Sequence, residues 1–110
     1  MIKRVLFLAL VFAAPTYLVS AQDANVSVDM IGIGSMSCAH WRSNKEHRLE
    51  GTVWIYGFWT GLNYVAAASG QAQATIEVGA IATEVDKTCA QQTSQTLANA
   101  AWTTYLGSKR

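Results

Sequence analysis

The feature that most restricts the fold of this chain is its pair of cysteines, Cys38 and Cys89, the only two in 110 residues. An even number of cysteines in a short exported chain most simply forms one disulfide. Such a bond closes a loop of about fifty residues and adds roughly 4 kcal/mol by restricting the unfolded chain. The alternative is a reactive or metal-binding thiol, but the chain has no Cys-x-x-Cys and no clustered ligand spacing.

The N-terminus has the layout of a secretory signal peptide. A basic start, Met1–Arg4, precedes ten apolar residues, Val5–Ala14. Val19 and Ala21 then occupy the small-residue positions of a cleavage site before Gln22. The apolar core is too short to cross a bilayer of ~30 Å, which requires ~20 helical residues. We expect residues 1–21 to be removed and the protein to be periplasmic, with an uncleaved anchor as the alternative.

Charge and size exclude several classes of protein for residues 22–110. Lys3 and Arg4 belong to the predicted signal, which leaves six of the eight basic residues against seven acidic ones. No basic stripe is present, so we do not expect a nucleic acid as partner. Charged residues make up only 14% of the chain and aromatic residues 10%, which argues against disorder. The length suits a single domain.

The uncharged run from Trp54 to Ala68, "WIYGFWTGLNYVAAA", is either a membrane span or the inner wall of a small bundle. The run lies between the two cysteines. A disulfide needs Cα atoms within about 7 Å, whereas a span would separate Cys38 from Cys89 by the thickness of a bilayer. Asn63, near the middle of the run, would also make insertion costly. We therefore expect a core helix and no stable membrane insertion.

The hydrophobic pattern predicts an all-α fold, a small bundle of three to four short helices joined by one disulfide. Residues 22–36 are expected to form a flexible lead-in, and residues 37–110 the helical domain. The polar stretch 44–51, "NKEHRLEG", is predicted to be a loop or a frayed turn. The predicted helices are 38–45, 52–68 with Gly70 after its end, 75–89, and a last one capped by Thr93 or Ser94 and ended by Gly107.

The long helix is predicted to be apolar around most of its circumference and therefore buried. Gly57 and Gly61 form a Gly-x-x-x-Gly spacing, which lets two helices approach closely. We expect that approach inside the core rather than in a membrane dimer. The residues chosen for core and protein interface together are Trp54, Phe58, Trp59 and Leu62.

The polar residues of interest are few. Asn63 lies in an apolar helix and must find hydrogen-bond partners, either in a neighbouring element or in a groove. His40 is interpreted as a helix surface residue or a pH-sensing contact, and His47 as a solvated loop residue. We find no catalytic set, no metal-ligand set and no cofactor motif, and therefore do not expect an enzyme.

The segments "SCAHW", "WIYGFWTGLN" and "IATEVDKTCAQQTSQTLANAAWTTYL", after a signal peptide, resemble small periplasmic proteins of the HdeA/HdeB acid-stress chaperone type. The resemblance covers roughly residues 36–106. It implies a helical fold whose disulfide joins an early helix to a later one, and holding of unfolded client proteins in acid. We expect other proteins as partners, and a homodimer is one expected oligomeric state. The chain departs from that family in having only seven acidic residues.

The chain is also similar to the Rap/Tai immunity proteins, which block cell-wall amidases delivered by type VI secretion. Those proteins likewise have a signal peptide, an aromatic helix with glycines and a final alanine-rich helix. This resemblance implies an inhibitor of one secreted toxin. A structural protein of the envelope is the third interpretation.

Overall fold

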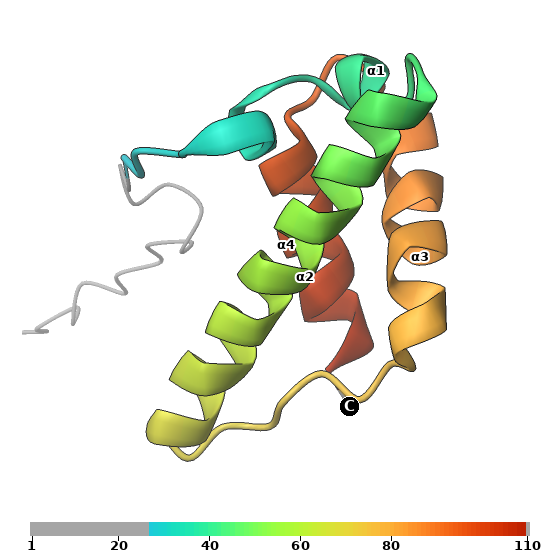
Figure 1. Cartoon of the computed structure of the whole chain (residues 1–110). Helices are drawn as coiled ribbons and strands as arrows, with labels where there is room; N and C mark the ends of the chain where they lie inside the picture. The colour runs from blue at the N-terminus through green and yellow to red at the C-terminus, as the bar shows by residue number, and fades with distance from the viewer. Residues whose placement is uncertain (1–26, 110) are drawn as a thin grey trace, which may run out of the picture.

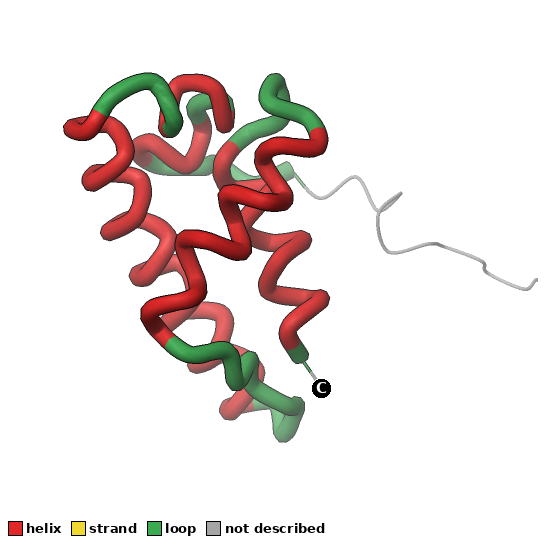
Figure 2. The backbone as a smooth tube through the Cα atoms, turned by 90° about the vertical axis from the view of Figure 1, so that its right-hand side faces the viewer, coloured by secondary structure: helices red, strands yellow, loops and turns green. Residues whose placement is uncertain are grey.

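The computed structural model describes residues 27–109; the predicted signal peptide and residues 22–26 lie outside the described residues. The described chain is all-α, as predicted, and has no strand (Figure 2). Four α-helices follow a short 3-10 helix (Figure 1). Their bounds are η2 Gly32–Ser35, α1 Cys38–Trp41, α2 Lys45–Ala68, α3 Val78–Gln91 and α4 Leu97–Ser108.

The predicted disulfide between Cys38 and Cys89 is present, with the two Cα atoms 5.5 Å apart. It joins the first residue of α1 to the last turn of α3, and both cysteines are fully buried. The core around it combines two large aromatic side chains, from α1 and α4, with aliphatic side chains from α2, α3 and α4. The fully buried large side chains are Trp41, Tyr105, Ile55, Leu97 and Val85.

Residues 45–51 are helical, so the prediction of a loop or a frayed turn over 44–51 is wrong. The side chain of Asn44 accepts a hydrogen bond from the backbone N–H of His47 and caps α2 at its start. The buried Trp41 also donates its indole N–H to the carbonyl of Arg48, 3.0 Å away. Consequently α1 ends at Trp41 rather than Lys45, and α2 is a long helix of 24 residues.

Gly51, at the end of that stretch, leaves room for the ring of Trp41. A Cβ atom on Gly51 would lie 2.1 Å from Cδ1 of Trp41. Gly51 is buried, and only a residue without a side chain allows the indole to pack against the α2 backbone at this turn. The polar composition of residues 44–51 therefore gives no indication of the close contact between Gly51 and Trp41.

The N-terminal segment is more ordered than the lead-in predicted over residues 22–36. Residues 27–31 form no regular element, but Gly32–Ser35 makes one 3-10 turn with Ile33 buried. Two backbone hydrogen bonds of 2.8 Å then attach the next residues to the start of α4 and the loop before it. The N–H of Cys38 donates to the carbonyl of Gln95, and the N–H of Leu97 donates to the carbonyl of Met36.

The connection between α2 and α3 is longer than predicted. Gly70 follows α2 in the left-handed region, with φ of 70°, as expected for the residue after a helix. The chain then runs without regular structure to Glu77, so α3 begins at Val78 rather than Thr75. The end of α4 comes down beside this connection (Figure 2).

The last helix begins slightly later than predicted. Thr96, rather than Thr93 or Ser94, caps α4 by accepting a bond from the N–H of Asn99. Its buried residues are Leu97, Ala98, Ala100, Ala101 and Tyr105, whereas Trp102 is 43% exposed. The helix thus presents small side chains to the disulfide region and Tyr105 to the opposite end.

Candidate functional site

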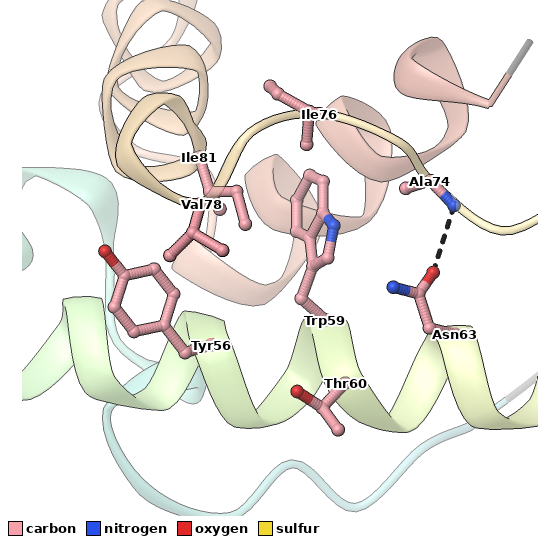
Figure 3. A pocket seen from close by; sticks show the side chains of 8 residues that line it. All are labelled: Tyr56, Trp59, Thr60, Asn63, Ala74, Ile76, Val78 and Ile81. Atoms are coloured by element: carbon pink, nitrogen blue, oxygen red, sulfur yellow. Dashed lines mark hydrogen bonds between the residues drawn. The ribbon is translucent and has the colours of Figure 1, made fainter.

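A cleft of about 340 Å³ opens between the second half of α2, the connection and the start of α3 (Figure 3). Its walls are mostly aromatic and aliphatic, with two polar side chains on α2. The lining residues are Tyr56, Trp59, Thr60, Asn63, Ala74, Ile76, Val78 and Ile81. A volume of this order, with apolar walls and few polar groups, is typical of a binding cleft.

The inner wall of the cleft is Trp59. Its side chain is only 3% exposed and meets Tyr105 of α4 edge to face, with ring centroids 5.2 Å apart. That arrangement is favourable for two aromatic rings and holds the indole in place. Trp59 is thus a core residue whose one free side borders the cleft.

Asn63 fixes the far end of the cleft. Its Oδ1 atom accepts hydrogen bonds from the backbone N–H of Ala74, at 3.0 Å, and from the hydroxyl of Tyr105, at 2.8 Å. Because a backbone N–H can only donate, this side of the amide must be the oxygen. The amide nitrogen has no bonded partner among the described residues and is turned toward Trp59 (Figure 3). Asn63 therefore combines a structural role with a donor at the cleft.

Trp54 and Phe58 lie elsewhere on α2. Their rings stack at 4.9 Å, and the indole N–H of Trp54 donates to the carbonyl of Ile31 at 2.8 Å. A Cβ atom on Gly34 would fall 2.0 Å from the same indole. Trp54 thus holds the N-terminal segment and Phe58 stacks on it, while Leu62 is half-buried against the core.

The face of α2 that carries Gly57 and Gly61 is exposed, contrary to prediction. Within the part of the chain that the structure describes, no atom of a neighbouring element lies within 4 Å of a Cβ built on either glycine. Val53 and Tyr64, on the same side, are 62% and 77% exposed. The prediction that a second helix packs closely on Gly57 and Gly61 is therefore wrong for the described residues. We call these four residues the α2 ridge; it is uncharged and apolar over about three turns.

The two histidines, treated separately in the sequence, lie together. The rings of His40 and His47 stack with centroids 3.9 Å apart. The hydroxyl of Ser43 lies 2.9 Å from Nδ1 of His47 and donates to the carbonyl of His40. Sequence reasoning missed the pair because it assigned His47 to a loop, whereas the first turn of α2 brings it back over α1.

A second, open groove of about 550 Å³ lies at the start of α2. Three cations line it, with Leu49 beside them at 67% exposure. Asp86 of α3 balances two of the cations, since its Oδ1 atom lies 3.0 Å from Nε of Arg42 and 2.8 Å from Nη1 of Arg48. The lining residues are Arg42, Asn44, Lys45, Arg48, Leu49 and Thr52. The sequence concealed this cluster because its charges are interleaved with polar residues.

The fold and these sites define a small all-α protein closed by a single disulfide. No family model matches the chain, and no curated protein or solved structure matches it either. Between residues 27 and 109, no helix has the length and hydropathy of a membrane span. The same residues contain no group of three side chains suited to hold a metal ion.

Proposed function

We propose that this chain is a periplasmic, non-enzymatic protein of the HdeA-like type that binds unfolded client proteins in acid. The observation that carries the proposal is the α2 ridge. Two large apolar side chains, Val53 and Tyr64, stand exposed on either side of two glycines, and no element within residues 27–109 covers them. An uncharged apolar surface on a rigid helix offers area to the apolar side chains of an unfolded chain.

An electrostatic link between α3 and the start of α2 supports the proposal. The carboxylate of Asp86 holds Arg42 and Arg48 and so connects α3 to the junction of α1 and α2. Without the negative charge of this carboxylate, two neighbouring guanidinium groups would have no counter-charge. The bundle would loosen on the side of α2 that faces α3, while the disulfide would keep the helices together.

The experiment is light scattering of an acid-denatured client, with and without the protein, at pH 2 to 3. The wild type is expected to suppress aggregation. The double variant Val53→Ser/Tyr64→Ser is expected to lose most of that effect, because it removes the large apolar groups of the ridge. Leu106→Ser is the matched control, since Leu106 is 48% exposed on α4, away from the ridge.

Two results would contradict the proposal. One is client aggregation that the wild type leaves unchanged. The other is equal suppression by the ridge variant and the wild type, which would exclude the ridge as the client surface. Tight one-to-one binding to a single cell-wall amidase, without suppression of aggregation, would favour the immunity interpretation instead.

A further inference from the structure

The groove at the start of α2 and the cleft at Trp59 lie in line along one side of this helix. The groove uses Lys45, Arg48, Leu49 and Thr52, and the cleft uses Tyr56, Trp59, Thr60 and Asn63. Spacings of three and four residues, with the adjacent pairs 48/49 and 59/60, place all eight on one broad helix face. This face looks toward α3, which supplies Asp86 at the groove and the side chains of Val78 and Ile81 at the cleft.

The groove has an excess of positive charge that its own carboxylate does not neutralise. Arg42 and Arg48 both use the same oxygen of Asp86, and each does so through one nitrogen, so their other N–H groups remain as donors. Lys45 has no ion-pair partner among the described residues. Three cations therefore face one carboxylate.

Arg48 is held in position by the protein itself, without a ligand. The guanidinium carbon of Arg48 lies 4.0 Å from the centre of the buried Trp41 ring. Stacking on an aromatic face restricts the side chain and leaves the edge of the guanidinium for an oxyanion. The exposed Leu49 beside it gives an apolar contact next to the charge.

The cleft supplies a complementary apolar site at a fixed distance. From Arg48 to Trp59 the helix rises about 16 Å at ~1.5 Å per residue. An extended peptide covers that length in about five residues. The free amide N–H group of Asn63 offers a donor to a backbone carbonyl of such a peptide (Figure 3).

We propose that this face of α2 binds an extended peptide whose carboxylate lies between Arg42, Lys45 and Arg48 and whose apolar side chain, about five residues away, enters the cleft at Trp59. Charge complementarity selects the acidic end, as in other arginine-lined peptide sites. The linear arrangement of a concave groove and a cleft suits an extended chain better than a membrane surface. This binding is independent of client holding at pH 2 to 3, because it requires an ionised carboxylate.

The test measures fluorescence anisotropy at pH 7 with labelled hexapeptides. Two probes carry glutamate at one end and leucine at the other, in both orders, and their analogues carry glutamine in place of glutamate. At least one glutamate probe is expected to bind about tenfold more tightly than its glutamine analogue, since a charge-assisted hydrogen bond is lost. Its affinity should fall as salt is raised.

Variants locate the site. Arg42→Gln and Lys45→Gln are expected to weaken the binding about tenfold each, and Val78→Ser, at a residue 64% exposed beside the cleft, about threefold. Lys87→Gln is the matched control, because Lys87 pairs with Glu84 outside the groove. Circular dichroism confirms that each variant remains folded.

Three outcomes would overturn the inference: no binding of either glutamate probe, equal affinity for the glutamine analogues, or equal weakening by Lys87→Gln. Binding to phosphatidylglycerol vesicles without binding to the peptides would also overturn it and assign the groove to lipid headgroups. None of these outcomes bears on suppression of aggregation in acid, so failure here and failure of the proposed function remain distinguishable.

Discussion

The two ends of the bundle are held together by different means. At one end the Cys38–Cys89 bond joins α1 to α3, and Trp41 fills the space beneath it with no exposed surface. At the other end α2 and α3 diverge, and a connection without regular structure joins them (Figure 1). There a single amide, that of Asn63, attaches both the connection and Tyr105.

This difference explains where a cleft can exist. A covalent bond at the first end keeps the helices together even if few contacts are made at the second. The second end can therefore leave space between α2 and α3 without loss of the fold. Regions with few packed contacts open most easily, so we expect the cleft end to adapt to a bound molecule while the disulfide end remains rigid.

The largest expected effect comes from removing the covalent bond. The double variant Cys38→Ser/Cys89→Ser should lose about 4 kcal/mol of unfolding free energy, because a separation of 51 residues makes the closed loop long. Urea denaturation followed by circular dichroism measures this. Reduced wild type is the control and should match the variant. A loss below about 1 kcal/mol would mean that packing alone holds the first end.

The next effect tests close packing at the same end. Gly51→Ala should cost about 3 kcal/mol, because the added methyl group would lie 2.1 Å from the Trp41 ring, which has no room to move. The same denaturation assay gives the value, and loss of the near-ultraviolet signal of the tryptophans should accompany it. An unchanged stability would show that Trp41 does not pack against this turn.

Sequence reasoning was most successful where chemistry is local and periodic. The cysteine pair, the helical class and the position of Gly70 after the long helix follow from residue type and spacing alone. It failed over residues 44–51, where polar composition suggested a loop. There the deciding contact, from Trp41 to the backbone of Arg48, is tertiary and leaves no periodic signal in the sequence.

The candidate site was predictable only in part. The sequence singled out Trp59 and Asn63. It could not distinguish Trp59 from Trp54, which has the same side chain but contacts the N-terminal segment. It also assigned Gly57 and Gly61 to a buried contact. Spacing gives the relative positions of residues on a helix, but the direction in which that face points depends on the other helices.

The third prediction concerns the cleft end. Asn63→Ala should lower the unfolding free energy by about 2 kcal/mol, because Tyr105 and the N–H of Ala74 each lose an acceptor. Hydrogen exchange should accelerate at Ala74 with little change in the disulfide region. Asn99→Ala, which removes an exposed bond to Gln95, is the control and should have a small effect. Equal acceleration of hydrogen exchange at both ends would contradict the expectation that the cleft end opens while the disulfide end remains rigid.

The smallest effect should have the opposite sign. Gly57→Ala places a methyl group where no neighbouring element among residues 27–109 lies within 4 Å. Strain is therefore absent, and the better helix former should stabilise the protein by about 0.5–1 kcal/mol. Gly51→Ala, in the same helix, is the matched counterpart. Thermal unfolding measured at several protein concentrations separates a change within one chain from a change between chains. A destabilisation by Gly57→Ala that grows with concentration would mean that a second copy packs on the α2 ridge, and the ridge would then be closed to clients whenever the protein is dimeric.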